Sequence, residues 1–198
     1  MILLQDLNTV SISLFFVSKK HTQRQYFMRT TFFKLWVHAI FHINENSVLI
    51  DPDLESLFYL EIEKRFIEQG CEVAIVNGNR DHVHILFTQN PLLPLHETMR
   101  FVQGITQRWY QMHDFKTGWY KFKWQEAYCA YSVSESLLEK AHFFIEKQVE
   151  IHQNLSYWDE IEHLNLLHNV DLSDDDTDVE MQSWQSRFSF KHIGKEFL

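Results

Sequence analysis

The sequence predicts an α+β fold with one antiparallel sheet, helices on one of its faces, and an additional helix towards the C-terminus. Strand-like alternation of apolar and polar residues, a hairpin-like pair of short apolar runs, and stretches with helical spacing follow one another along the chain. The length of 198 residues suits one domain, or one domain with an appendage. The 5 glycines and 3 prolines exclude a collagen-like or Gly/Pro-rich disordered protein.

The first strand is predicted over Phe33–Ile43, because apolar side chains alternate with others along it. The alternate face of this strand carries Lys34, Trp36, His38 and His42. Asp51 and Pro52 are typical of a helix start, with Asp as the cap and Pro in the first turn. Gly70 is expected to end that helix, so a strand and a helix open the patterned region.

A hairpin, a second helix and a fourth strand follow. Cys71–Val76 and His82–Thr88 are predicted strands, joined by the tight turn at Asn77-Gly78-Asn79. His96–His113 has helical spacing, and Trp119–Tyr131 is strand-like. The order β-α-β-β-α-β predicts a ferredoxin-like (RRM-like) arrangement, a four-stranded antiparallel sheet with both helices on one face.

Two helices are predicted after the sheet. Ser136 and Glu139 have the spacing of a capping box before a helix over Leu137–His152. A helix of polar and aromatic residues is expected over Tyr157–His168. Residues 31–168 are therefore interpreted as the domain. Residues 1–27 are interpreted as a loose extension, and residues 169–198, with seven acidic and three basic side chains, as an acidic tail.

Composition excludes several classes of protein. The only two cysteines, Cys71 and Cys129, exclude a disulfide framework and indicate a reducing, cytoplasmic location. No apolar run reaches the roughly 18 residues that span a bilayer, so no membrane partner is expected. The formal net charge of −9 has the opposite sign to that of most nucleic-acid-binding domains, which bind phosphate through a basic excess.

Asp81-His82-Val83-His84-Ile85-Leu86 is the first candidate site. On a strand, residues i and i+2 lie on the same side, so His82 and His84 project together and can share one metal ion. Solvated or hydrogen-bonded histidines are the alternative, and spacing alone favours it. Further along, Phe144, Gln148 and His152 share one helix face with apolar neighbours. Gln148 and His152 either emerge into solvent or face the histidine pair.

Lys121 and Lys123 alternate with aromatic residues in the segment that ends with Trp124 and Gln125. Such a strip can contact phosphates and stack bases. An edge strand protected by lysines explains the same pattern at least as well.

Taken in order, these motifs resemble those of the single-tyrosine HUH transposases, which include small insertion-sequence transposases and REP-associated tyrosine transposases. Asp81–Leu86 is similar to the HUH motif, that is, His, a hydrophobic residue and His. Phe122–Tyr128 resembles a strand containing Trp-Gln in one branch of the family, and Phe144–Gln148 resembles the helix motif Tyr-Ile-x-x-Gln. The resemblance covers about Thr31 to His168.

The resemblance implies that His82, His84 and Gln148 bind one divalent cation, Mg²⁺ or Mn²⁺, in a site whose ligands carry no charge. In the family this metal polarises the scissile phosphate of DNA, and a helix tyrosine attacks it to form a 5′-phosphotyrosine. The resemblance also implies a homodimer and single-stranded or hairpin DNA as the partner. The expected DNA contacts are Lys121, Lys123, Trp124 and Arg108.

The sequence departs from the family pattern at the nucleophile position, where Phe144 stands four residues before Gln148. A phenyl ring has no hydroxyl to attack phosphorus. Asn44-Glu45-Asn46 stands where the family often has basic residues, which together with the acidic net charge indicates weak DNA binding. We therefore predict a transposase-like protein that keeps the fold and some DNA binding, but lacks tyrosine-dependent strand cleavage.

Three alternatives stay open at this point. An active transposase could use Tyr128, Tyr131 or Tyr157, although none has the four-residue spacing to Gln148. A metal-dependent nuclease could use metal-bound water, although the sequence offers no evident general base. An unrelated α+β protein could match the motifs by accident.

Overall fold

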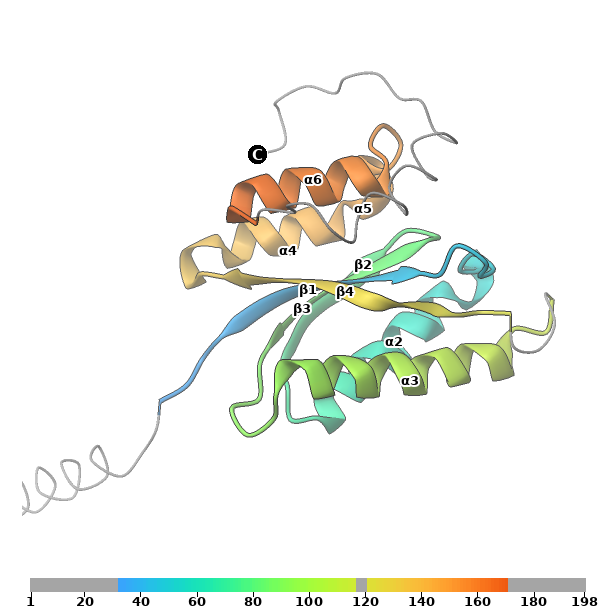
Figure 1. The fold of residues 1–198 in the computed structure, drawn as a ribbon, viewed down its shortest axis with the longest axis horizontal. Helices are drawn as coiled ribbons and strands as arrows, with labels where there is room; N and C mark the ends of the chain where they lie inside the picture. Colours follow the sequence, from blue (N-terminus) through green and yellow to red (C-terminus); the bar gives the residue numbers. More distant parts are fainter. Residues whose placement is uncertain (1–31, 117–120, 171–198) are drawn as a thin grey trace, which may run out of the picture. The chain divides into compact units, whose positions relative to one another are not determined.

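The computed structural model describes residues 32–116 and 121–170. They contain a four-stranded antiparallel sheet with the strand order β2-β3-β1-β4 (Figure 1). The strands are β1 (Trp36–Ile43), β2 (Val73–Gly78), β3 (His82–Thr88) and β4 (Trp124–Val133). The predicted α+β class and the four-stranded antiparallel sheet are therefore confirmed. The predicted extension, residues 1–27, and the predicted acidic tail beyond Val170 lie outside the described residues.

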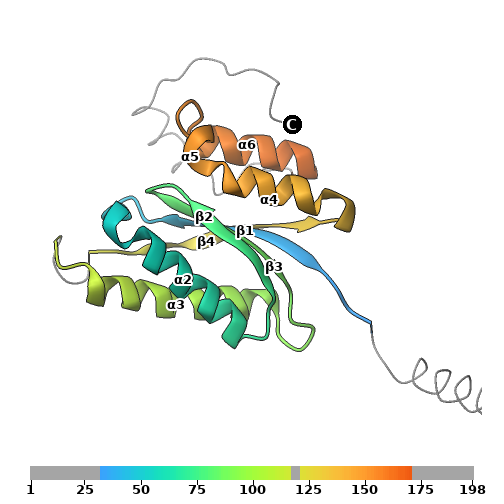
Figure 2. The same cartoon turned by 180° about the vertical axis from the view of Figure 1, so that it is seen from behind.

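Helices cover both faces of the sheet (Figures 1 and 2). One face is covered by α2 (Pro52–Glu68) and α3 (Leu95–His113). The other face carries a short 3₁₀ helix, η1, and three α-helices; these are η1 (Glu135–Leu137), α4 (Leu138–Glu146), α5 (Gln148–Ile151) and α6 (Tyr157–His168). In the described ranges, no helix combines the length and apolarity that crossing a bilayer requires.

The start of α2 forms as its sequence predicts. The side chain of Asp51 accepts a hydrogen bond from the backbone N–H of Asp53 at 3.0 Å, and Pro52 occupies the first turn. Gly70 follows the helix with φ of 74°, a left-handed conformation that strongly favours glycine.

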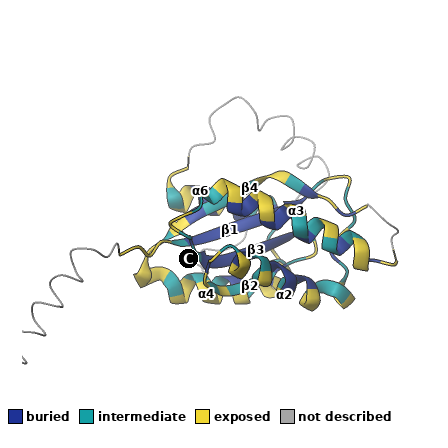
Figure 3. Ribbon diagram, turned by 90° about the horizontal axis from the view of Figure 1, so that it is seen from below, coloured by how far each residue is buried: buried dark blue, intermediate teal, exposed yellow. Residues whose placement is uncertain are grey.

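The sheet separates two different kinds of packing. On the α2 and α3 side, alternate residues of β1 and β3 join an apolar core around Phe58, which has no exposed surface. On the other side, the same two strands present His38, His42, His82 and His84, all buried. Figure 3 shows β1 and β3 in dark blue beneath the helices. The period of two along each strand therefore gives one apolar face and one face rich in imidazole.

The hairpin between β2 and β3 depends on Gly78. A Cβ atom at this position would lie 2.2 Å from the carbonyl oxygen of His82, which is closer than side chains tolerate. A residue without a side chain is therefore required directly beside the first histidine of the His82-Val83-His84 motif.

Two sequence-based expectations about the C-terminal helices are wrong. The predicted helix over Leu137–His152 is interrupted at Lys147, whose φ of −93° and ψ of 14° separate α4 from α5. The capping box expected at Ser136 does not form, because the chain makes the 3₁₀ turn η1 there and Ser136 bonds Ser134 at 3.0 Å. The capping box lies instead at α6, where Ser156 and Asp159 bond each other's backbone N–H groups.

The fourth strand also differs from the prediction, which placed it over Trp119–Tyr131. The structure begins β4 at Trp124, so Lys121 and Lys123 precede the strand and do not share a strand face. Lys123 instead connects to the turn after β1, since its backbone N–H donates to Ser47 at 2.9 Å and its carbonyl accepts from Asn44 at 2.9 Å.

Replacing the two candidate capping serines tests which one stabilises a helix. Ser156→Ala removes the capping box of α6 and should lower the free energy of unfolding by about 1 kcal/mol. Ser136→Ala removes a side chain that caps no helix and should change it by less than about 0.5 kcal/mol. Urea denaturation of both variants measures the difference, and equal effects would contradict the assignment.

Candidate metal site

Register between β1 and β3 brings four histidines to one place. The antiparallel pairing sets His42 opposite His82 and Ile40 opposite His84, and His38 lies one side-chain pair further along the same face. His84 and His38 are hydrogen-bonded through Nδ1 and Nε2 at 2.8 Å. The two histidines predicted from their spacing are therefore part of a larger imidazole cluster.

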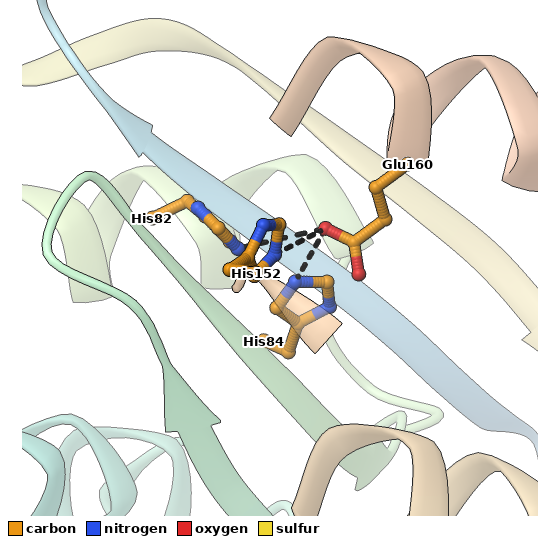
Figure 4. A group of neighbouring side chains, drawn as sticks. All are labelled: His82, His84, His152 and Glu160. Carbon is orange, nitrogen blue, oxygen red and sulfur yellow. Dashed lines mark hydrogen bonds and ion pairs between the residues drawn. The ribbon is translucent and has the colours of Figure 1, made fainter. Parts of the chain in front are cut away.

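The segment that follows α4 completes this cluster (Figure 4). Gln148 opens α5, His152 directly follows it, and Glu160 lies in the first turn of α6. The Oε2 atom of Glu160 lies 3.5 Å from Nε2 of His82, 3.3 Å from Nε2 of His84 and 3.1 Å from Nε2 of His152. These four ligand atoms all lie within 4.8 Å of one another.

Gln148 contacts both the imidazoles and the carboxylate of the cluster. Its Oε1 lies 3.2 Å from Nε2 of His82 and 3.0 Å from Nε2 of His152. Its Nε2 donates to Oε1 of Glu160 at 2.8 Å. The structure thus brings together His82, His84 and Gln148, as the sequence predicted, and adds a carboxylate to a ligand set expected to carry no charge.

The outer nitrogen of each of the three histidines has a partner of its own. Nδ1 of His82 bonds Oδ1 of Asp81 at 2.6 Å, and Nδ1 of His152 donates to the carbonyl of Leu155 at 2.7 Å. Nδ1 of His84 bonds His38. Such outer bonds fix the ring orientation and direct the inner Nε2 atoms towards one point, as in metal sites whose histidines are held from behind.

Burial and charge oppose each other in this cluster. Burial together with the neighbouring His84 lowers the pKa of His38 to about 3, so its ring is neutral. Burial disfavours the charged form of His82, yet Asp81 and Glu160 outweigh that effect and raise its pKa. Burial alone would raise the pKa of Glu160, but the surrounding imidazoles hold it well below its usual range. Glu160 is therefore ionised.

The donor set fits a metal ion. Three imidazole nitrogens and one carboxylate oxygen are ligands that Zn²⁺ and neighbouring transition metals accept. Nε2 of His84 is buried and makes no hydrogen bond of good geometry, although the Glu160 carboxylate is near it. A buried ring nitrogen without a good hydrogen bond is costly, and a metal ion would give it a partner.

Phe144 lies at the edge of the same cluster. Its ring centroid is 6.0 Å from that of His84 and 6.1 Å from that of His38, both in edge-on arrangements. It lies on α4, four residues before Gln148, which opens α5 after the break at Lys147.

The predicted DNA-contacting residues lie elsewhere, and one of them was wrongly chosen. Trp124 is only 6 % exposed; its indole stacks on Phe58 at 5.6 Å and its N–H donates to Thr106 at 3.1 Å. No face of that ring is left for a nucleic-acid base. Lys121, Lys123 and Arg108 are exposed, with Arg108 on α3 across the sheet from the histidine cluster.

Sequence reasoning missed Glu160 and His38. Glu160 shares a helical stripe with Tyr157, Ile161 and Leu164, and an acid within an apolar stripe was a signal that could have marked it. His38 lies on the same face of β1 as His42, 44 residues before the His82-Val83-His84 motif in sequence. Only the β1–β3 register connects it to His84.

No curated protein sequence matches the chain. Among solved structures, a candidate transposase from Deinococcus radiodurans R1 is similar over 61 % of this chain and 95 % of that one, with a TM-score of 0.48 and 20 % identity. A REP-associated tyrosine transposase bound to a REP hairpin is similar over 63 % and 72 %, with a TM-score of 0.39 and 12 % identity.

A match to the sequence model of one family shows which family this chain belongs to. The model described as "Transposase IS200 like" matches residues 31–148, which is more than half of the chain. The match contains the whole sheet, α2 to α4, and the His82-Val83-His84 motif, and it ends at Gln148. The chain therefore belongs to the IS200-like transposase family.

Proposed function

We propose that this member of the family binds single-stranded or hairpin DNA but forms no tyrosine–DNA bond. The position of Phe144 carries the proposal. The ring of Phe144 lies edge-on to His84, four residues before Gln148, where the resemblance to the Tyr-Ile-x-x-Gln motif implies a catalytic tyrosine. A phenyl ring offers no oxygen to attack phosphorus.

The other tyrosines are poor substitutes for this nucleophile. Tyr131 is buried, and its hydroxyl donates to Asn165 at 2.7 Å. Tyr128 packs against the apolar core on the α2 and α3 side. Tyr157 is the strongest alternative, since its ring lies 5.1 Å from that of His82, but burial raises the pKa of its phenol well above the usual value. A phenol held in its protonated form is a weak nucleophile.

Access to the histidines also argues against cleavage. His82, His84 and Glu160 have no exposed surface, and the carboxylate of Glu160 faces the inner nitrogens of both rings. A bound divalent cation supplies Lewis-acid polarisation of a phosphate oxygen. A phosphate could reach such a cation only after the Glu160 carboxylate moved away.

The exposed lysines before β4 are the best-supported DNA contact. Lys121 and Lys123 are both solvent-exposed, and the backbone of Lys123 is anchored to the turn after β1 by its bonds to Asn44 and Ser47. Anchored cations of this kind can neutralise phosphates. With a net charge of −9 on the whole chain, the binding is expected to be weak and strongly salt-dependent.

The absence of a covalent intermediate can be tested directly. We expect the full-length protein to give no protein–DNA band on a denaturing gel with labelled hairpin or single-stranded DNA, whether Mg²⁺, Mn²⁺ or Zn²⁺ is present. Phe144→Tyr restores only a hydroxyl, so we expect no band or a trace of one, because Glu160 still covers the histidines. The matched control for this variant is Tyr157→Phe.

Two outcomes would contradict this part of the proposal. A covalent band in the unmutated protein, mapped to Tyr157 or Tyr131, would mean an active transposase with another nucleophile. Metal-dependent cleavage that leaves free ends on both sides of the break would mean a nuclease that uses water.

Charge removal tests the DNA-binding surface. Replacing Lys121 and Lys123 by Ala should weaken hairpin binding and lower the slope of log K against log salt by about 1.5–2, because two phosphate contacts are lost. The control pair, Lys64→Ala with Lys140→Ala, changes the net charge equally on α2 and α4 and should leave the slope within about 0.5 of the original. Equal effects of the two pairs would exclude this surface, and no binding by the unmutated protein at any salt concentration would exclude DNA binding.

A further inference from the structure

Two potential metal ligands come from a segment beyond the residues that the family model matches. The family match ends at residue 148, whereas His152 and Glu160 come later in the chain. Glu160 is completely buried, which carboxylates almost never are unless they are paired. Its Oε2 atom faces the Nε2 atoms of three histidines rather than an arginine or lysine.

The three distances from the Glu160 carboxylate to the histidine nitrogens agree with a tetrahedral site. Zinc–nitrogen and zinc–oxygen bonds of about 2.0–2.1 Å place tetrahedral ligand atoms about 3.3 Å apart. The distances from Glu160 Oε2 to the three histidine nitrogens are 3.1, 3.3 and 3.5 Å. The carboxylate thus lies at the edge length that one shared ion would impose.

We propose that His82, His84, His152 and Glu160 form a closed four-ligand site for a transition-metal ion of the Zn²⁺ type. The ion would join β3 to the α5–α6 segment and so have a structural role. All four side chains come from one chain, and the ligand set leaves no position open for water or phosphate. This inference is independent of the proposed DNA binding, since the site would form in a protein that binds no DNA.

The ligand types select the metal. Three imidazoles and one carboxylate favour Zn²⁺ over Mg²⁺, which prefers octahedral oxygen ligands and keeps its waters. Among divalent first-row metals, the general order of affinity also ranks Zn²⁺ above Mn²⁺. This differs from the Mg²⁺ or Mn²⁺ that the family resemblance implied for His82, His84 and Gln148.

Gln148 is a positioning residue in this site. Its amide N–H donates to Oε1 of Glu160, which turns the other oxygen of that carboxylate towards the histidines. Its own oxygen lies against His82 and His152. In the proposed four-ligand site this oxygen does not bind the metal ion. Removing Gln148 should therefore weaken the site without changing its coordination number.

Metal titrations of the full-length protein test the proposal. After treatment with a chelator and dialysis, the protein should bind one Zn²⁺ at least about 100-fold more tightly than Mn²⁺ or Mg²⁺. Glu160→Gln and His152→Ala should each lower the Zn²⁺ affinity by at least about 100-fold, more than loss of an outer-shell partner costs. His163→Ala removes an exposed histidine from the same helix and should leave the affinity unchanged.

Co²⁺ provides a readout of coordination number, because tetrahedral Co²⁺ absorbs visible light far more strongly than six-coordinate Co²⁺. The unmutated protein and Gln148→Leu should show the strong absorption, whereas Glu160→Gln and His152→Ala should lose it. Loss of the strong absorption in Gln148→Leu would overturn its assignment as a positioning residue.

Three results would overturn the site itself. The first is a weak, six-coordinate Co²⁺ spectrum in the unmutated protein. The second is a Zn²⁺ affinity of His82→Ala equal to that of the unmutated protein. The third is a Zn²⁺ affinity that stays at the unmutated level in both Glu160→Gln and His152→Ala. If one variant fails to fold, the spectrum of the unmutated protein and the remaining variants still decide. A metal site confirmed without DNA binding would leave this inference standing and remove only the proposed function.

Discussion

A carboxylate that loses all contact with water must be compensated by hydrogen bonds or opposite charge, and Glu160 meets this requirement in an uncommon way. Its partners are three imidazoles and the amide of Gln148, gathered from β3 and from the chain around α5. The need to compensate this buried carboxylate explains how the side chains on the α4–α6 side of the sheet are arranged. The capping box of α6 positions the first turn that carries Glu160, and the outer partners of the histidines hold the rings that face it.

The period of two along the strands gives the sheet two chemically different faces. Towards α2 and α3, alternate residues of β1 and β3 are apolar and pack around Phe58. Towards α4 and α6, most of the intervening residues are histidines, and several of these bond one another or the C-terminal segment. Burial that is favourable for hydrocarbon is costly for imidazole and carboxylate, so the second face is stable only when each polar atom has a partner.

Local patterns predicted most of the fold. The alternation of β1 and the cap at Asp51 depend on neighbours in sequence, and both were interpreted correctly. The turn before His82 was placed too early, because Asn77 and Gly78 belong to β2 and the chain turns after them. Trp124 was misjudged because alternation alone does not say which side of a strand meets a helix. Ser136 was misjudged because a 3₁₀ turn competes with the capping box and leaves the same sequence signature.

The candidate site was predictable only in part. His82 and His84 share a strand face by a rule that needs no tertiary information, and the resemblance of the Phe144–Gln148 segment supplied the glutamine. Glu160 reaches His82 across 78 positions of sequence, a closeness that no periodicity encodes. The contact depends on how α6 folds back over the sheet, and that in turn depends on the break between α4 and α5 at Lys147.

This fold-back makes the buried cluster the product of one chain. Every described member, from His38 on β1 to Glu160 on α6, belongs to the same polypeptide and closes against its own sheet. A cluster assembled in this way forms by a first-order process, at a rate that does not depend on protein concentration. That independence means that the cluster forms as fast in a dilute solution of the protein as in a concentrated one.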